Sequence, residues 1–148
     1  MNRYSTKELE TYIHSLYARL EPVAKKDGVY RLLDDYFDTG TPGGRDGSFC
    51  YADDDGYHFG VNERGVLRVN VVTKSLSEIV FQVLWSDILW MAVEYEHAHR
   101  IKGQDFRRLM FKKMMQYWNV LGPEYSAQAE KKIADTLAQS PFQDDLLR

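Results

Sequence analysis

The sequence predicts an α+β fold, in which an N-terminal helix is followed by a small antiparallel β-meander and then by three C-terminal helices packed on the sheet. Two observations carry this prediction. Apolar residues recur at helical spacing near both ends of the chain, and the middle is rich in aromatic and β-branched residues separated by tight-turn dipeptides. Because 148 residues is the usual size of one domain, we expect residues 1–148 to form a single domain.

The first helix is predicted to begin at Ser5 and to end near Lys26. Ser5 and Glu8 have the spacing of a capping box, which satisfies free N–H groups at a helix start. Asp27-Gly28 is a stop signal. The apolar positions between them follow the spacing of an amphipathic helix, at Leu9, Tyr12, Ile13, Leu16, Tyr17 and Leu20.

A three-stranded meander is predicted after an irregular segment at 30–47, whose residues 39–44 form a Gly- and Pro-rich loop. The dipeptides Asp55-Gly56 and Arg64-Gly65 are tight-turn signals between the strands. The predicted strands are 48–51, 57–61 and 66–73. In the third strand, the more apolar alternating set is expected to face the helices, namely Leu67, Val69, Val71 and Thr73.

Three helices complete the predicted fold. One runs from Leu76 to about Ile101 behind a second capping box of Ser75 and Glu78, and its polar half includes Asp87 and Glu96. Its inward arc is predicted to hold Val80, Phe81, Leu84, Trp85, Ile88, Met91, Ala92 and Tyr95. The next two helices are predicted at 106–121, capped by Asp105 and directing Phe106, Leu109, Met110, Met114, Tyr117 and Leu121 inward, and at 124–138 after Gly122-Pro123.

Composition excludes several function classes. A net charge of −3 argues against direct nucleic-acid binding, and the longest unbroken apolar run, Ile88–Val93, is too short to span a membrane. The first residues lack the apolar region of a signal peptide, so we expect a cytoplasmic protein. The single cysteine, Cys50, excludes an internal disulfide and a multi-cysteine metal site.

The most chemical-looking cluster is Glu94, His97 and His99. Glu-x-x-His places two ligand types on one helical face, as in di-iron bundles, but those sites need a second such motif and further glutamates. The alternative is that His99 is a packed residue on the apolar arc. We therefore expect no metal, no cofactor and no catalytic residue, and keep a small metal-binding protein or enzyme at this cluster as the alternative function.

Charge is distributed unevenly. Residues 33–63 have a local balance of −7, and residues 100–113 have a balance of +5. Solvated faces would explain both runs; the functional alternative is that the acids attract a basic partner. Tyr51 and Tyr57 flank the acidic turn and either contact that partner or cover the sheet. The candidate partner-binding residues are Asp34, Asp35, Asp38, Tyr51, Asp53, Asp54, Asp55 and Tyr57.

The run from Tyr95 to Arg108 is distinctive, with Tyr-Glu-x-x-His-Arg followed by Gln-Asp-x-Arg-Arg. Together with Glu63-Arg-Gly65 and the closing Pro141-Phe-x-Asp144, it resembles the bacterial immunity protein 63 family over about residues 57–145. The resemblance implies an antitoxin, not an enzyme, that is encoded beside a polymorphic toxin and binds the toxin domain in the cytoplasm. It also implies that the toxin is a nuclease in many cases, which would suit an acidic surface. The oligomeric state, monomer or dimer, stays open.

The run itself has a physical interpretation. It ends one predicted helix and opens the next, so its opposite charges are expected to pair across the Lys102-Gly103 turn. Glu96 and Arg100 are also an i, i+4 pair in the favourable order. It is then mainly architectural, and the alternative is a patch that contacts the toxin or a ligand. The residues assigned to this structural motif are Tyr95, Glu96, His99, Arg100, Asp105, Arg107 and Arg108.

Overall fold

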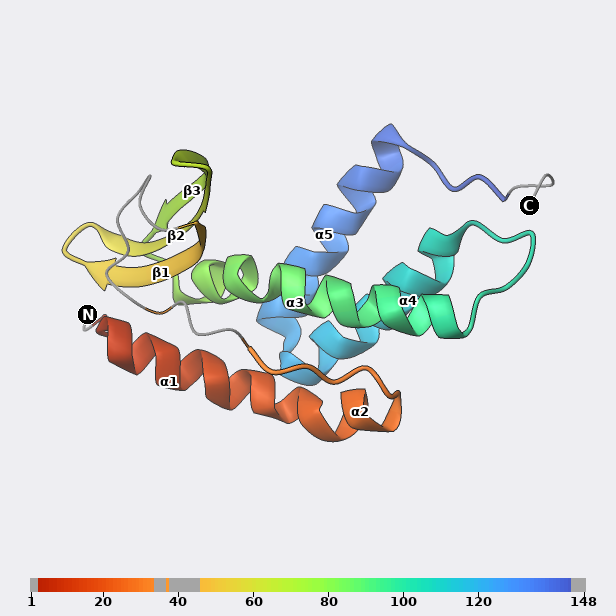
Figure 1. Ribbon diagram of the computed structural model, residues 1–148, viewed down its shortest axis with the longest axis horizontal. Coiled ribbons are helices and arrows are strands. Elements are labelled where there is room, and N and C mark those ends of the chain that lie inside the picture. The colour runs from red at the N-terminus through yellow and green to blue at the C-terminus, as the bar shows by residue number, and fades with distance from the viewer. Residues whose placement is uncertain (1–2, 34–36, 38–45, 145–148) are drawn as a thin grey trace. The chain divides into compact units, whose positions relative to one another are not determined.

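The computed structural model describes residues 3–33, 37 and 46–144 (Figure 1). The predicted α+β class and the predicted order of helix, meander and three further helices are confirmed. The elements are α1 (Thr6–Tyr17), η1 (Ala18–Leu20), α2 (Glu21–Lys26), β1 (Gly47–Asp53), β2 (Gly56–Glu63), β3 (Val66–Thr73), α3 (Leu76–Ala98), α4 (Phe106–Leu121) and α5 (Pro123–Gln139).

Contacts within the chain divide it into two compact units. The first comprises Met1–Leu16 and Leu33–Leu84, and therefore holds most of α1, the whole sheet and the first turns of α3. The second comprises Tyr17–Leu32 and Trp85–Arg148, with η1, α2, the rest of α3, α4 and α5. The single domain expected over 1–148 stays a prediction.

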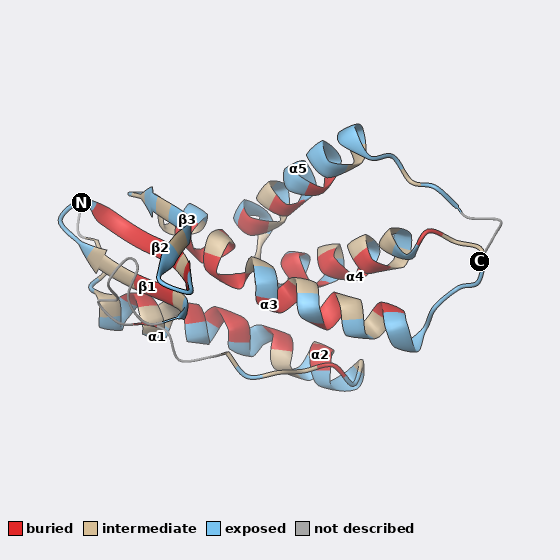
Figure 2. Ribbon diagram, turned by 45° about the horizontal axis from the view of Figure 1, so that its top comes forward, coloured by how far each residue is buried: buried red, intermediate tan, exposed pale blue. Residues whose placement is uncertain are grey.

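The first unit is organised around an antiparallel sheet of order β1-β2-β3. The central strand β2 is almost wholly buried, as Figure 2 shows. The Phe49 ring lies where a side chain at Gly60 would project, so only glycine fits at that position of β2. The start of α1 is tied to β1 because the Ala52 N–H donates to Thr6 Oγ1 at 2.9 Å. The predicted capping box is confirmed: Ser5 N–H donates to the Glu8 carboxylate at 2.9 Å, and Glu8 N–H donates to Ser5 Oγ at 3.1 Å.

Strand β3 is an edge strand with no fully buried residue. Leu67, Val71 and Thr73 are half-buried, as the predicted inward set requires. Val69 departs from that set, with an exposed fraction of 37%. Its partner is Val61, and the β2–β3 register shifts between Val61 and Asn62. This irregularity interrupts the alternation of the two faces beside Val69.

The predicted first helix is broken into α1, η1 and α2. Pro22 stands at the start of α2 and has no N–H to donate to the carbonyl four residues earlier, so the helix tightens into a 3₁₀ turn there. The predicted stop after Lys26 is confirmed. Gly28 has φ +75°, and Val29 N–H returns to the Ala24 carbonyl at 2.9 Å.

Helix α3 ends at Ala98, three residues earlier than expected. At its start Ser75 Oγ accepts from Glu78 N–H at 3.2 Å, but the Glu78 carboxylate accepts from Thr73 Oγ1 instead of closing the predicted box. The predicted inward residues are buried or half-buried. Asp87 and Glu96, expected on the polar half, are also buried, with exposed fractions of 9% and 2%.

Helix α3 also has the length and composition of a membrane-crossing helix, and it alone does so among the described residues. Half of its most apolar window is buried within the fold. Core helices of globular proteins satisfy the same criteria, so this finding is weak support for a membrane span.

In the second unit, α4 and α5 pack against each other across the Gly122-Pro123 junction (Figure 1). Five apolar residues of α4 face inward: Met110, Met114, Tyr117, Trp118 and Leu121. The prediction that Phe106 also points inward is wrong, because its exposed fraction is 38%. Phe106 is the first residue of α4, where no preceding turn of the helix covers it. Leu109 is only half-buried.

Candidate functional site

The acidic turn, residues Asp53 to Gly56, joins β1 to β2. Asp53 pairs with Gly56, so the two central residues of the turn are Asp54 and Asp55, one position earlier than the predicted dipeptide. Gly56 has φ +136°, and a Cβ there would lie 2.7 Å from the Thr73 carbonyl oxygen. The turn thus requires glycine at its end and leaves two adjacent acids at its tip.

Asp53 belongs to the structure of the turn itself. Its Oδ1 accepts from Asp55 N–H at 2.9 Å and lies 2.7 Å from Nε2 of His58. The hydrogen bond from His58 is the main cause that lowers the pKa of Asp53. Among the candidate acids, Asp53 is therefore already committed to contacts within the protein.

Arg3 fixes the backbone of the same turn. Its guanidinium donates to the carbonyl oxygens of Asp53 at 2.9 Å and of Asp54 at 2.8 Å. No residue in the described part of the chain pairs with the carboxylates of Asp54 and Asp55, which are both exposed. The turn therefore holds two carboxylates in solvent on a fixed backbone.

The two candidate tyrosines have different positions. Tyr57 has an exposed fraction of 3%, and its hydroxyl accepts from Tyr4 N–H at 3.0 Å. Its ring is therefore part of the core beside the turn. Tyr51 is half-buried, and its ring stacks on His58 with 4.3 Å between centroids. Burial, with the charges of Asp53 and Asp55, raises the pKa of Tyr51. Only Tyr51 can offer part of its ring to a partner.

Other candidate acids cannot be placed beside this turn. Asp34, Asp35 and Asp38 lie outside the described residues.

A recess of about 590 Å³ adjoins the turn. It is lined by Arg3, Tyr4, Ser5, Glu8, Ala52, Asp53 and Asp54.

The Tyr95–Arg108 motif belongs to the second unit and begins with a buried carboxylate. Glu96 accepts from Arg100 twice, at 3.0 Å from Nε and at 2.8 Å from Nη2. Tyr95 stacks on His99 with 4.1 Å between ring centroids, and the ammonium of Lys113 lies 4.0 Å from the centre of the Tyr95 ring. The prediction that His99 lies along the apolar arc is wrong, because the helix ends before it and its side chain is exposed.

The second half of the motif surrounds Asp105, the N-cap of α4, whose exposed fraction is 3%. Its carboxylate accepts from the backbone N–H and the side chain of Arg107 and from Gln143 N–H. These hydrogen bonds, led by the Arg107 side chain, hold the pKa of Asp105 well below its usual range. Asp144 accepts from Arg108 and from Asp105 N–H, each at 2.9 Å.

The expected pairing across the Lys102-Gly103 turn is therefore wrong. Glu96 pairs with Arg100 at the end of α3, and Asp105 pairs with Arg107 at the start of α4. Arg108 pairs with Asp144 in the segment 140–144. The basic excess of residues 100–113 is likewise largely neutralised. Among the described residues, only Lys102 and Lys112 of that run have no acidic partner, since Lys113 pairs with Asp27 at 3.1 Å.

The two partners missed by sequence reasoning are Asp27 and Asp144. Asp27 accepts from Lys113 and from the Tyr117 hydroxyl, which lie 86 and 90 residues away in the chain. Asp144 ends the Pro141-Phe-x-Asp144 motif, but nothing in its spacing links it to Arg108. No local pattern signals either contact.

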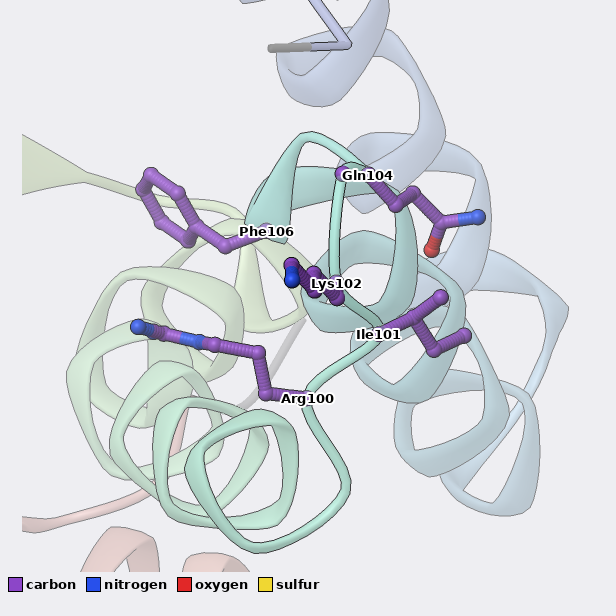
Figure 3. A pocket seen from close by; sticks show the side chains of 6 residues that line it. Arg100, Ile101, Lys102, Gln104 and Phe106 are labelled. Carbon is purple, nitrogen blue, oxygen red and sulfur yellow. The ribbon is translucent and has the colours of Figure 1, made fainter. Parts of the chain in front are cut away.

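A second recess, of about 610 Å³, opens between the two halves of the motif (Figure 3). Arg100 and Phe106 project on one side of the loop, with Lys102 between them, whereas Ile101 and Gln104 project on the other. The lining residues are Arg100, Ile101, Lys102, Gly103, Gln104 and Phe106, and none of them is acidic.

The alternative of a metal-binding protein or enzyme gains no support from the geometry. Glu94, His97 and His99 are exposed, and the described part of the chain holds no group of three or more potential metal ligands of the His, Cys, Asp or Glu type. Cys50 is buried, which raises the pKa of its thiol to about 12 and disfavours the reactive thiolate.

Comparison with known proteins then identifies the chain. The profile of the immunity protein 63 family matches residues 53–135, from the acidic turn into α5, which is more than half of the sequence. The matched range ends before Pro141–Asp144 and begins slightly earlier than expected. Neither the curated proteins nor the solved structures contain a match. The chain belongs to the immunity protein 63 family.

Proposed function

We propose that this protein is an antitoxin that acts in the cytoplasm, binding a cognate secreted toxin domain and neutralising it by stoichiometric occlusion. Membership of the immunity protein 63 family is the observation that carries the proposal, because it suggests an antitoxin role and implies a toxin protein as partner. Protein inhibition of this kind needs a complementary surface and no chemistry of its own.

The acidic turn is the proposed toxin-facing surface in the first unit. Asp54 and Asp55 are exposed, adjacent and without a partner among the described residues, and Arg3 fixes the backbone that carries them. Adjacent carboxylates repel one another, and a basic partner would relieve that repulsion. Tyr51 adds part of an aromatic ring at the edge of the same turn.

The toxin domain is proposed to be a nuclease. A nuclease cleft that binds phosphates is basic, and carboxylates at the tip of a hairpin could occupy the phosphate positions. Fixing the turn before binding lowers the entropy lost on association. Opposite charges would also accelerate association and make it sensitive to salt.

Protection of toxin-expressing cells tests this proposal. The informative variant is Asp54→Asn with Asp55→Asn, which leaves the structural Asp53 intact. The matched control is Glu94→Gln with Glu130→Gln, because it removes the same charge from exposed residues of the second unit that have no acidic or basic partner among the described residues.

We expect the wild type and the control to protect cells that express the toxin encoded beside this gene, and the turn variant to protect less. Loss of protection by the control alone would contradict the assignment of the turn. Failure of the wild-type chain to protect against that toxin would contradict the antitoxin function itself.

A further inference from the structure

We infer that the loop between α3 and α4, together with the first residue of α4, is a second protein-binding surface, on which Ile101 and Phe106 project on opposite sides of the loop and Lys102 is exposed, and that it accepts a carboxylate flanked by apolar side chains on the toxin. The inference rests on the proposed function and deepens it. It assigns Ile101, Lys102 and Phe106 to contact with the toxin, and the motif's acids Glu96 and Asp105 to holding the ends of the loop.

The apolar part of this surface is unusual for a short loop. Ile101 has an exposed fraction of 50%, and Phe106 has one of 38%. Both line the recess of about 610 Å³, and Gly103, with φ +80°, has no heavy atom near the position a Cβ would take. Exposed apolar residues beside an open recess mark interaction surfaces more often than isolated ones do.

The charge of the surface is positive. Lys102 is exposed and has no acidic partner among the described residues. Arg100 uses Nε and Nη2 for Glu96, so in the described part of the chain its Nη1 has no hydrogen-bond partner, and its side chain is 54% exposed. Because no lining residue is acidic, the complementary occupant carries a negative charge.

Both ends of the loop are held in place. Before it, Glu96 binds the side chain of Arg100. After it, Asp105 caps α4 and accepts from Gln143 N–H, while its own N–H donates to Asp144. Anchors at both ends reduce the ordering cost when the residues between them bind a partner.

An acidic segment of the toxin is the occupant we favour over a nucleic acid. A phosphate backbone would suit the cations but not the exposed Ile101 and Phe106, and the chain as a whole carries a net charge of −3. Family membership implies a protein partner.

Calorimetric titration of the chain into a catalytically inactive form of the toxin domain tests the inference. The test variant is Ile101→Ser with Lys102→Glu. The matched control, Val120→Ser with Lys112→Glu, replaces a β-branched apolar residue and a lysine in the same way at exposed positions of α4 outside the recess. Circular dichroism establishes that both variants are folded.

The expected result is an affinity loss of about tenfold or more for the test variant and little change for the control. Equal affinity of the test variant and the wild type would overturn the loop surface while leaving the antitoxin function standing. No binding by the wild type would instead remove the proposed function. If the test variant changes only the sedimentation of the free chain, the occupant is a second copy and the inference is wrong.

Discussion

The guanidinium of Arg107 lies against the carboxylate of Asp105, with Nη2 2.8 Å from Oδ2 and Nε 3.2 Å from Oδ1. The same guanidinium donates to the carbonyl oxygens of Ser140 and Pro141, at 2.8 and 2.9 Å. One buried acid and its base thus connect the start of α4 to the segment that follows α5. This relationship makes the stability of the second unit depend on a carboxylate.

Replacement of Asp105 separates its two roles. Asp105→Ala removes the helix cap, which should lower the free energy of unfolding by about 1 kcal/mol, and it lowers it further because the guanidinium of Arg107 loses its main partner. Asp105→Asn keeps a capping oxygen, so its free energy of unfolding should fall less. Urea unfolding measures both values, and equal stability of Asp105→Ala and the wild type would contradict the assigned role.

Acid should destabilise the protein through the same carboxylate. Hydrogen bonds from Arg107 lower the pKa of Asp105, and those from Arg108 lower the pKa of Asp144. The folded state therefore binds fewer protons than the unfolded state around these pKa values. The stabilisation from the two carboxylates is complete above their unfolded pKa of about 4 and is lost as pH falls toward their lower folded pKa values. Melting temperatures measured across this range should fall less steeply for Asp105→Asn. An unchanged slope would show that the carboxylate is not responsible.

The two motif arginines should differ in importance. Arg100→Ala leaves Glu96, with 2% exposure, as a buried carboxylate without its partner. Arg108→Ala breaks a pair whose side chains are 41% and 48% exposed, and solvent screens such pairs. Calorimetry should therefore show a larger drop in melting temperature for Arg100→Ala. The reverse order would contradict this interpretation of burial.

The effects of replacing Lys113 and Asp27 on stability should be coupled. Both side chains are largely buried, at 10% and 17% exposure. Lys113→Ala is expected to destabilise by about 3 kcal/mol, because it leaves Asp27 without its ammonium partner. Adding Asp27→Asn should recover part of that loss, since it removes the stranded charge. A double-mutant cycle measures the coupling, and strict additivity of the two changes would contradict it.

Local signals predicted most of the fold. The Ser5/Glu8 capping box, Gly28 and Asp105 each act within a few residues, so their effect is readable from the sequence. The break before α2 was not predicted, although Pro22 is a local signal for it. The early end of α3 was harder to predict, because Tyr95 and His99 have helical spacing although the helix ends between them, at Ala98.

The candidate site was harder to predict because its contacts are not local. The acidic turn was placed at the right hairpin, but the commitment of Asp53 depends on His58 across the strand pair. The burial of Glu96 and the pairing of Lys113 with Asp27 depend on tertiary packing. Charge runs alone therefore overstated the basic surface, because most of its members are paired in the folded chain.

The most direct measurement is a titration of the active toxin domain with the purified chain, followed by the toxin activity that remains. Stoichiometric occlusion predicts a linear loss of activity that is complete at an equimolar ratio and is restored when the complex is dissociated. Toxin activity that persists at a large excess of the chain would contradict the account. Loss of activity at a small fraction of equimolar would also contradict it, because the chain would then act on the toxin as an enzyme.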